Sequence, residues 1–319
     1  MARAVSGSGI SDKLVVLVGG SGFVGTHLAQ ALLARGARLR IACRHPKRAF
    51  KIKPLGNLGQ VQFASLDVTR PETLERALAG ADAVVNLVGA FAGDLDAVMG
   101  RGAGAVASAA KAAGAGAFVH VSAIGADANG TTAYARAKAA GEASVLAAFP
   151  TATVVRPSVL FGPDDQFINL FAGLIAAVPV LPVFAPTAQF QPLFVDDLAE
   201  AIANALETPA AFAGKTFELG GPEAISVADL NQRIAAAQDR SVLFAPLPDA
   251  FAGLIAALTG WLPGAPLTRQ QWQLLKAGNV VSGKLPGIAD LGVVARPLDL
   301  FLDRWMVRYR KHGRFGTAS

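Results

Sequence analysis

The stretch LVVLVGGSGFVG, from residue 14 to residue 25, decides the fold. Its five apolar residues Leu14–Val18 predict a buried strand, and the Ala- and Leu-rich run Phe23–Arg35 that follows predicts a helix ended by Gly36. Three glycines with the spacing G-x-x-G-x-x-G connect the two elements. A glycine pattern alone is a weak signal, but one that follows a strand and opens a helix indicates a nucleotide-binding unit.

Each glycine of this turn has a separate physical task. Gly19 permits the tight turn, Gly22 lets the backbone approach a pyrophosphate, and Gly25 lets the helix pack closely on the strand. The free N–H groups and the positive end of the helix then hold the phosphates. We therefore predict a phosphate site that is formed by Gly19, Gly22, Phe23, Val24 and Gly25.

Short apolar strands alternate with Ala-rich helices through the first half of the chain. The strands are expected at Leu14–Val18, Leu39–Ala42, Val61–Ala64, Ala83–Leu87, Phe118–Val121 and Thr153–Val155. The helices between them are expected at Phe23–Arg35, Pro71–Leu78, Leu95–Ala113 and Thr132–Phe149. This alternation predicts an α/β fold, a Rossmann-type doubly wound parallel sheet with helices on both faces.

Beyond Pro157 prolines become frequent and helices dominate. Helices are expected at Val195–Leu206, Val227–Gln238, Thr268–Lys276 and Leu298–Tyr309, with strands near Gln191 and Thr216. We predict a disordered tail at residues 1–12, a nucleotide-binding domain at 13–156, and a smaller, mainly helical lobe at 157–319. Segments of that lobe are expected to return to the sheet.

Composition excludes several classes of protein. The chain has 319 residues, of which 52% are hydrophobic and 16% charged, so it is not a disordered chain. One cysteine forms no internal disulfide, and the four histidines are scattered, so no metal site is expected. The net charge of +6 fits an anionic cofactor or surface, and no nucleic-acid-binding motif accompanies it.

Two long stretches carry almost no charge. Residues 166–195 have none, and residues 241–267 have only Asp249, but prolines interrupt both. Neither stretch predicts a transmembrane helix, and residues 1–11 lack the apolar core of a signal peptide. We therefore expect a cytoplasmic protein. The stretches fit an apolar substrate pocket or a peripheral contact with the cytoplasmic face of the inner membrane.

The residues that follow the second strand bear on the choice of cofactor. An NAD site usually has Asp or Glu here to bind the ribose 2′-hydroxyl, but neither occurs between Ala37 and Ile52. Arg44, helped by Lys47 or Arg48, suits a 2′-phosphate instead. This pattern favours NADP(H) over NAD(H), and the alternative is a solvated basic loop.

The ends of the next strands supply further candidate contacts to the cofactor. Asp67 and Val68 follow the third strand, where the adenine edge is expected. Leu87, Val88 and Gly89 follow the fourth strand, where a small loop can pass under the cofactor. The alternative for both groups is that they only terminate strands.

A serine, a tyrosine and a lysine follow the fifth strand. Ser122 closes that strand, and Tyr134 and Lys138 lie four residues apart, on one face of the next helix. With the glycine turn, these residues resemble the extended or atypical branch of the short-chain dehydrogenase/reductase superfamily. The resemblance implies that Tyr134 is the acid or base, that Lys138 lowers its pKa and holds the ribose, and that Ser122 orients substrate. Pro157 and Ser158 match the hinge where that family's chain passes the nicotinamide.

Later segments are similar to the nucleotide-binding accessory subunit of respiratory complex I and its bacterial homologues. The similarity covers residues 13–314 and includes the segments FGPDDQFIN (161–169), QPLFVDD (191–197), LTR (267–269), LPGIADLG (285–292) and the basic tail from Tyr309. It implies a tightly held NADPH with a structural role. Related proteins are linked to ubiquinone biosynthesis.

Two functions remain open on the sequence. One is an NADP(H)-binding protein whose nucleotide serves structure, assembly or redox sensing, with a membrane-associated respiratory or quinone-pathway complex as partner. The other is an active NADP-dependent reductase, dehydrogenase or epimerase for an apolar carbonyl or alcohol. The intact set Ser122, Tyr134 and Lys138 is compatible with both, because the same side chains also bind the ribose and nicotinamide.

Overall fold

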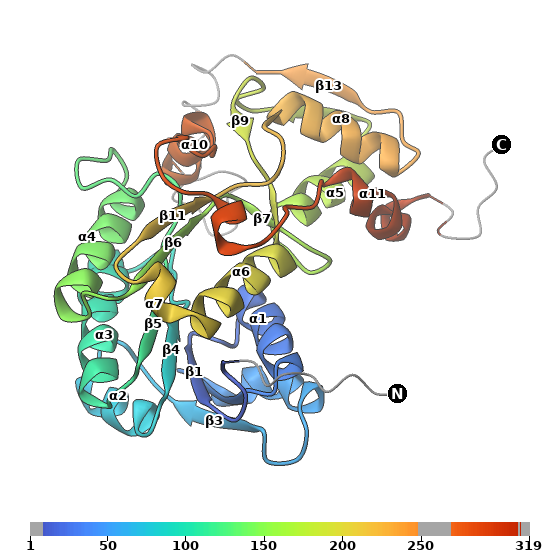
Figure 1. The fold of residues 1–319 in the computed structure, drawn as a ribbon. Helices are drawn as coiled ribbons and strands as arrows, with labels where there is room; N and C mark the ends of the chain where they lie inside the picture. The colour runs from blue at the N-terminus through green and yellow to red at the C-terminus, as the bar shows by residue number, and fades with distance from the viewer. Residues whose placement is uncertain (1–8, 248–268, 312, 314–319) are drawn as a thin grey trace. The chain divides into compact units, whose positions relative to one another are not determined.

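Seven parallel strands form the sheet at the centre of the first of two compact units (Figure 1). The computed structural model describes residues 9–247, 269–311 and 313. The strands run β11-β6-β5-β4-β1-β2-β3 across the sheet. Their bounds are β1 Leu14–Val18, β2 Arg38–Cys43, β3 Val61–Ser65, β4 Ala83–Asn86, β5 Ala117–Val121, β6 Thr153–Pro157 and β11 Thr216–Leu219. The predicted Rossmann-type doubly wound sheet is confirmed.

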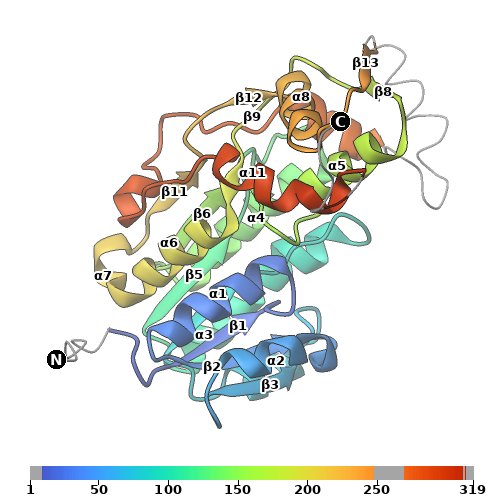
Figure 2. The same ribbon diagram turned by 90° about the vertical axis from the view of Figure 1, so that its right-hand side faces the viewer.

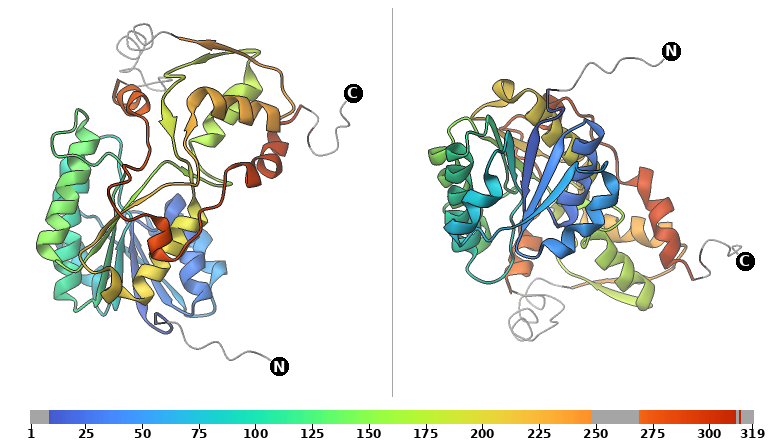
Figure 3. Two further views of the ribbon diagram at one scale, coloured as in Figure 1. Left: turned by 45° about the horizontal axis from the view of Figure 1, so that its top comes forward. Right: turned by 90° about the horizontal axis from the view of Figure 1, so that it is seen from below.

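Helices cover both faces of this sheet (Figures 1 and 2). One face carries α1 (Phe23–Ala34) and α6 (Val195–Glu207), which pack on each other. The other face carries α2 (Pro71–Leu78), α3 (Gly102–Ala112) and α4 (Ala133–Ala148), and Figure 3 shows these layers from below. Among the described residues, four helices were not predicted: η1 (Pro46–Leu55), α7 (Pro209–Phe212), η3 (Ile288–Leu291) and, in the second unit, α5 (Ile168–Ala177).

The strand order reverses between β1 and β4. From β1 the chain builds outward through β2 and β3, and then returns to place β4 on the other side of β1. In doubly wound sheets the crevice at the carboxyl ends of the two strands at this reversal is where ligands bind. The glycine turn and the residues after β4 both lie at that edge.

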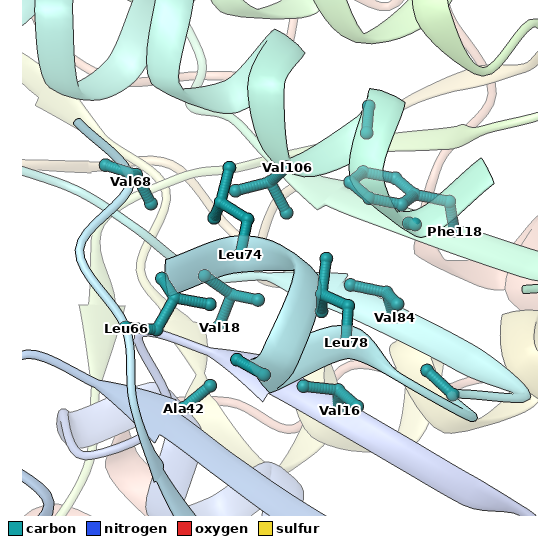
Figure 4. Close-up of a cluster of buried hydrophobic side chains, with 14 of the residues drawn as sticks. Val16, Val18, Ala42, Leu66, Val68, Leu74, Leu78, Val84, Val106 and Phe118 are labelled. Atoms are coloured by element: carbon teal, nitrogen blue, oxygen red, sulfur yellow. The ribbon is translucent and has the colours of Figure 1, made fainter. Parts of the chain in front are cut away.

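One buried core lies between the sheet and the layer of α2, α3 and α4 (Figure 4). Alternate residues of β1, Val16 and Val18, point into it, because successive side chains of a strand face opposite sides. They meet Leu74 and Leu78 of α2, while Val106 of α3 closes the cluster. Continuous apolar strands are expected here because both faces of the sheet are covered.

The predicted helix Leu95–Ala113 is divided in the structure. A π-helical turn, η2 (Asp96–Arg101), precedes α3, and it lies against α4. At Gly141 of α4 an added Cβ would lie 2.2 Å from the backbone oxygen of Met99, so the two segments approach at backbone distance. Glycine is unfavourable inside a helix, and the apolar periodicity that predicted one continuous helix does not take this into account.

The start of the described chain departs from the predicted tail. Residues 1–8 lie outside the described residues, but residues 9–12 form a turn in which Ile10 is buried. The N–H of Asp12 donates to the Gly36 carbonyl at 3.0 Å. Burial of the Ile10 side chain and this backbone hydrogen bond explain why residues 9–12 form a defined turn.

The second unit comprises Ser158–Phe194, Gly220–Val281 and Ala295–Ser319, and the segments Val195–Leu219 and Ser282–Val294 belong to the first. It contains three two-stranded sheets: β7 (Leu160–Phe161) with β10 (Leu193–Phe194), β9 (Gln189–Phe190) with β12 (Ile225–Ser226), and β8 (Val180–Val183) with β13 (Leu243–Pro246). Its helices are α5 (Ile168–Ala177), α8 (Val227–Ala237), α10 (Arg269–Ala277), α11 (Asp299–Met306) and η4 (Val307–Tyr309). Among the described residues of this unit, more lie in helices than in strands.

Local contacts explain two of the quoted segments in the second unit. The carboxylate of Asp165 accepts the N–H of Ile168 at 2.6 Å, which fixes the start of α5. Phe161 and Phe194 form an aromatic cluster with Phe301 and Trp305 of α11. In contrast, residues 267 and 268 of the LTR segment lie outside the described residues.

A membrane-spanning helix would need a long apolar run. Across residues 9–247, 269–311 and 313, no helix has both the length and the apolar character to cross a bilayer. Most of the weakly charged stretch 241–267 lies outside the described residues.

Candidate functional site

The glycine turn has the geometry that a pyrophosphate site requires. Gly19 has φ +80°, in the left-handed region, and a Cβ there would lie 3.2 Å from the backbone of Leu87. A Cβ at Gly25 would lie 2.3 Å from the Gly20 carbonyl oxygen, so α1 can approach β1 only with glycine at this position. At Gly22 the nearest atom to an added Cβ is 3.8 Å away. Gly19 and Gly25 are therefore structural requirements, and Gly22 leaves room above the turn.

The first turn of α1 offers backbone donors. Its N-cap, Gly22, makes no side-chain cap, and no acidic side chain lies in the first turn. The N–H groups at the start of a helix have no partner within it and carry the positive end of the dipole. Phe23 and Val24 stand at these positions. The turn therefore fits a dinucleotide phosphate.

Two cations stand after β2. Arg44 and Lys47 are both exposed, and no carboxylate accompanies them between Ala37 and Ile52. The pKa of Asp67 is lowered, chiefly by hydrogen bonds from Thr69 and further by the positive charge of Arg44. Arg44 thus lies within electrostatic reach of Asp67. Val68, next to Asp67, is buried against the core, so of this pair only Asp67 has a polar side chain, and Thr69 already donates to it.

A buried amide holds the loop after β4. The side-chain oxygen of Asn86 accepts the N–H of Val88 at 3.2 Å, and the N–H of Leu87 donates to the Val18 carbonyl at 2.8 Å. The Asn86 side-chain nitrogen lies 3.3 Å from Nδ1 of His120 on β5. These contacts fix Leu87 and Val88, while Gly89 is exposed and has open space around its Cα.

The predicted set Ser122, Tyr134 and Lys138 comes together at the carboxyl end of β5. Thr132 caps α4 by accepting the N–H of Ala135 at 3.1 Å, which places Tyr134 in the first turn. The Lys138 ammonium donates to the Val121 carbonyl at 3.0 Å and lies 6.0 Å from the centroid of the Tyr134 ring. Ser122 directly follows Val121, so the three residues share one neighbourhood.

Ser122 has a hydroxyl in need of a partner. The residue is buried, and its Oγ makes no hydrogen bond to any residue of the described chain. Buried hydroxyls are almost always hydrogen-bonded, and leaving one unpaired is unfavourable. A bound carbonyl or hydroxyl group would satisfy it, which is what the resemblance expects of this serine.

Burial dominates the electrostatics of this neighbourhood. It lowers the pKa of Lys138 to about 8, although the charge of Glu142 acts in the opposite direction. Burial raises the pKa of Tyr134 to about 12. Burial, with the charge of Lys138, lowers the pKa of His120 to about 3, so its imidazole is neutral at pH 7. A neutral phenol is suited to giving a proton rather than taking one.

An ion-pair network behind Lys138 escaped the sequence analysis. Glu142 accepts two hydrogen bonds from Arg156, at 2.9 and 2.7 Å, and Glu218 lies 3.8 Å from the same guanidinium. The hydrogen bond to Glu142 is the largest cause of the raised pKa of Arg156. Glu142 is one turn beyond Lys138, a spacing that can be seen in the sequence. Arg156 comes from β6 and Glu218 from β11, and no sequence pattern near either residue indicates this network.

Phe91 is a second residue that the sequence did not indicate. Its ring stacks on Tyr134, with centroids 5.0 Å apart and planes 11° apart. It belongs to the segment between β4 and η2, which has no periodic pattern. Only the folded chain brings it to α4.

The two hinge residues fall in different units. Pro157 ends β6 in the first unit, and its carbonyl accepts the N–H of Ile124 at 3.1 Å. Ser158 begins the second unit and donates its hydroxyl to the carbonyl of Gln191 at 2.5 Å. The structure therefore groups the other candidate residues within the first unit and leaves Ser158 outside that group.

Metal ligands are not grouped in the described chain. Within residues 9–247, 269–311 and 313, no three His, Cys, Asp or Glu side chains lie close enough together to hold an ion.

Comparison with known proteins gives three findings. The model of the NAD dependent epimerase/dehydratase family matches residues 15–220. A rat protein, NADH dehydrogenase [ubiquinone] 1 alpha subcomplex subunit 9, mitochondrial, is 31% identical over 315 residues, which cover 96% of this chain and 82% of that protein. The Arabidopsis thaliana protein of the same name is 28% identical and covers 98% of this chain and 82% of its own length.

Solved structures agree on the fold. The Citrobacter sp. triphenylmethane reductase complexed with NADP(H) superposes with a TM-score of 0.74 at 18% identity, covering 92% of this chain and 99% of that one. At such identity the likeness establishes the fold alone.

Proposed function

The chain belongs to the NAD dependent epimerase/dehydratase family, and from this premise we propose that it is an NADP(H)-binding relative of the complex I accessory subunit that keeps its nucleotide chiefly for structure or assembly. The observation that carries the proposal is the glycine turn, with Gly19 in the left-handed region and an uncapped α1, beside the exposed cation Arg44. Similarity to subunit 9 over 96% of this chain supports the structural role.

The preference for NADP(H) rests on charge. Arg44 and Lys47 supply cations where NAD-binding relatives of the fold place a carboxylate. A guanidinium can donate two charge-assisted hydrogen bonds to a 2′-phosphate, whereas the uncharged 2′-hydroxyl of NAD(H) cannot accept such a pair. The nearby carboxylate of Asp67 accepts hydrogen bonds from Thr69, and its single negative charge is outnumbered by the two cations Arg44 and Lys47.

The partner follows from the relatives. Proteins similar to this chain are named as subunits of mitochondrial NADH dehydrogenase. We propose a membrane-associated respiratory or quinone-pathway complex as the partner, with this protein attached to it peripherally. Co-purification with such a complex from detergent-treated membranes, lost after a nucleotide-site variant, would support assembly through the nucleotide.

The first experiment identifies the nucleotide that the protein retains. The full chain is purified without added nucleotide, washed extensively and denatured, and the released nucleotide is identified and counted. Near-stoichiometric NADP(H) is expected. An empty protein that takes up NADPH reversibly would contradict the structural role, and released NAD(H) would contradict the cofactor preference.

A structural nucleotide also stabilises the fold. A ligand that binds only the native state adds about 2.7 kcal/mol to the free energy of unfolding at 100 times its Kd. NADPH should therefore raise the Tm, and the rise should depend on its concentration. A Tm unchanged by NADPH would contradict binding.

A second candidate is an active reductase, and the unpaired hydroxyl of Ser122 favours it. In this reading Ser122 donates to the substrate carbonyl oxygen, and the neutral phenol of Tyr134 gives that oxygen a proton. Lys138 holds its charge close to the phenolate that remains. The nicotinamide, when bound, supplies the hydride.

The variant Tyr134→Phe separates the two candidates. An enzyme should lose at least roughly 100-fold in kcat. Its Kd for NADPH should stay nearly unchanged, because the phenyl ring and Lys138 remain. A structural protein should keep its nucleotide and its partner complex in this variant.

A further inference from the structure

A run of cations without any carboxylate extends from β2 through η1 to β3. Residues 37–66 contain no Asp or Glu. Their seven cations are Arg38, Arg40, Arg44, Lys47, Arg48, Lys51 and Lys53. The proposed nucleotide site uses Arg44 and Lys47, so most of this charge has no role there.

The cations of β2 differ from those of η1. The Arg40 guanidinium donates to the carbonyls of Ala77 and Ala79, at 3.0 and 2.7 Å, so it serves the fold. The cations of η1 are exposed, and none of them has an ion-pair partner within residues 9–247, 269–311 and 313: Lys47, Arg48, Lys51 and Lys53. Their charge is therefore available to a partner outside the chain.

The geometry of η1 sorts its side chains into rows. It is a 3₁₀ helix, in which side chains three residues apart lie above one another. One row, with Ala49 and Ile52, is buried. The other two rows are exposed and carry Lys47, Phe50 and Lys53 in one row and Arg48 and Lys51 in the other. The helix therefore presents a half-exposed phenylalanine between two lysines.

The turn after η1 presents a leucine to solvent. Leu58 is fully exposed, and it follows the exposed Phe50 and Leu55 within nine residues. The Gln60 side chain holds this turn, because its oxygen accepts the N–H of Asn57 at 2.9 Å and its nitrogen donates to the Ala37 carbonyl at 2.8 Å. Single exposed hydrophobic residues are ordinary, but a group of them on one held segment indicates an interaction surface.

We propose that η1 and the turn at Leu58 form a docking surface for an anionic lipid bilayer. Its cations would contact the headgroups, and Phe50, Leu55 and Leu58 would enter the boundary between headgroups and acyl chains. Interfacial segments of other proteins combine basic with Phe and Leu side chains in this way. The inference rests on the peripheral attachment proposed above, for which it names the surface and the lipid charge, and it needs no bound nucleotide.

Charge alone would also suit a nucleic acid or an acidic protein, but the apolar side chains favour a bilayer. Nucleic-acid bases stack on aromatic rings, and the one aromatic residue of η1, Phe50, already meets the ring of Phe63 at 5.0 Å between centroids. An acidic protein would leave Leu58 in water unless it had a matching pocket. A bilayer takes up the cations and the apolar side chains together, without such a pocket.

Binding of the full chain to lipid vesicles tests the proposal. Vesicles of phosphatidylcholine and phosphatidylglycerol in equal parts are compared, by co-sedimentation, with vesicles of phosphatidylcholine alone. The protein should bind the anionic vesicles and leave them as salt is raised, because salt screens exposed charges. Absence of binding to the anionic vesicles, or equal binding to both kinds, would overturn the proposal.

Two variants separate the charges from the apolar contact. Lys51→Gln combined with Lys53→Gln should weaken binding to the anionic vesicles by roughly 20-fold, about fivefold for each cation. Leu58→Ser should weaken it by roughly tenfold, because the vesicle no longer buries the leucine side chain. Both variants should fold normally, since all three side chains are exposed.

Matched controls remove the same kinds of side chain elsewhere. Lys111→Gln combined with Lys215→Gln removes two exposed lysines outside residues 37–66, and Leu300→Ser removes an exposed leucine of α11. Both controls should bind the anionic vesicles as the wild type does. Equal losses in the two lysine pairs would assign the binding to the net charge of +6 rather than to η1, and would overturn the proposal.

The position of Leu58 gives a second readout. Lipids with brominated acyl chains quench the fluorescence of a tryptophan that enters the bilayer, and the chain already has three tryptophans as a baseline. Leu58→Trp should show quenching beyond that of the wild type, whereas Leu300→Trp should not. Absence of additional quenching in Leu58→Trp would overturn the insertion of this turn.

Other partners and failure of the proposed function give different patterns. Tighter binding to polyglutamate or to duplex DNA than to the anionic vesicles would assign the surface to an acidic protein or a nucleic acid, and would overturn the lipid. The Kd for NADPH should be the same in all these variants, because Arg44 and Lys47 remain. A chain that binds the vesicles but not NADPH would contradict the nucleotide proposal alone, and one that binds NADPH but not the vesicles would contradict the docking surface alone.

Discussion

At the end of β2, Arg44 and Lys47 stand in solvent, whereas at the end of β5 Ser122 and Lys138 are buried. Both groups belong to the candidate nucleotide site of the first unit. The exposed end offers backbone N–H groups and exposed cations. The buried end works through a few side chains that other residues fix in place.

The difference decides which physical effects act at each end. Exposed charges keep their hydration and are screened by salt, so they add little to the stability of the fold and act mainly on selectivity between ligands. Buried groups lose hydration, so their pKa values move: that of Lys138 falls to about 8 and that of Tyr134 rises to about 12. Mutations should accordingly change affinity and salt dependence at one end, and stability and pH dependence at the other.

The largest effect is expected at the glycine turn, where buried backbone atoms rather than exposed charges set the geometry. Gly25→Ala puts a Cβ within 2.3 Å of the Gly20 carbonyl oxygen, so α1 must move away from the turn. We expect a loss of about 3 kcal/mol in the free energy of unfolding, measured by urea denaturation, and no NADPH binding. Gly22→Ala is the control, since its nearest contact is 3.8 Å, and it should fold normally. Equal stability losses in both variants would contradict the assignment.

The buried end can be broken through the support behind Lys138. Glu142→Gln removes the closer of the two charges that pair with Arg156, and should cost about 2–3 kcal/mol, because the guanidinium keeps only Glu218, at 3.8 Å, as its ionic partner. The control is Glu223→Gln, whose partner Arg233 is more exposed, and this change should cost less than about 1 kcal/mol. Comparable losses in the two variants would show that burial does not distinguish the pairs.

The pH dependence of stability sharpens the contrast. The folded-state pKa of Lys138, about 8, lies below its ordinary value of 10.5, so the unfolded chain binds more protons between these pH values. The free energy of unfolding attributable to Lys138 should therefore rise by about 2 kcal/mol from pH 8 to pH 10. Lys138→Met should abolish this rise. The raised pKa of Tyr134 acts in the opposite direction, but only above pH 10.

The smallest effect is expected at the exposed cations. Arg44→Ser should weaken NADPH binding by roughly tenfold and leave NADH binding nearly unchanged, because only NADPH carries the 2′-phosphate. The difference should shrink in high salt. The control is Lys53→Ser, which removes an exposed cation of η1 and should change the binding of neither nucleotide. Equal weakening of both nucleotides by Arg44→Ser would refute the NADP(H) preference.

Local patterns predicted the sheet and much of the candidate site. The strand Leu14–Val18 has the predicted bounds, and the glycine turn and the pair Tyr134 and Lys138 stand on the predicted elements. Each of these depends on residues close together in the chain. The helix Leu95–Ala113 was predicted as one element but is divided by a π-helical turn. At this turn Met99 lies close to Gly141 of α4, a contact with a distant segment that the local sequence does not show.

The sequence by itself determined the order of strands and helices, the turn that needs glycine at positions 19 and 25, and the spacing that puts Tyr134 and Lys138 on one helix face. Periodicity and backbone sterics act within a few residues, so they are legible along the chain. Only the tertiary structure decided that Phe91 stacks on Tyr134, that Arg156 pairs with Glu142, and that the Ser122 hydroxyl has no hydrogen-bond partner among the described residues. These features depend on burial and on contacts between distant segments, and burial is a property of the packed chain.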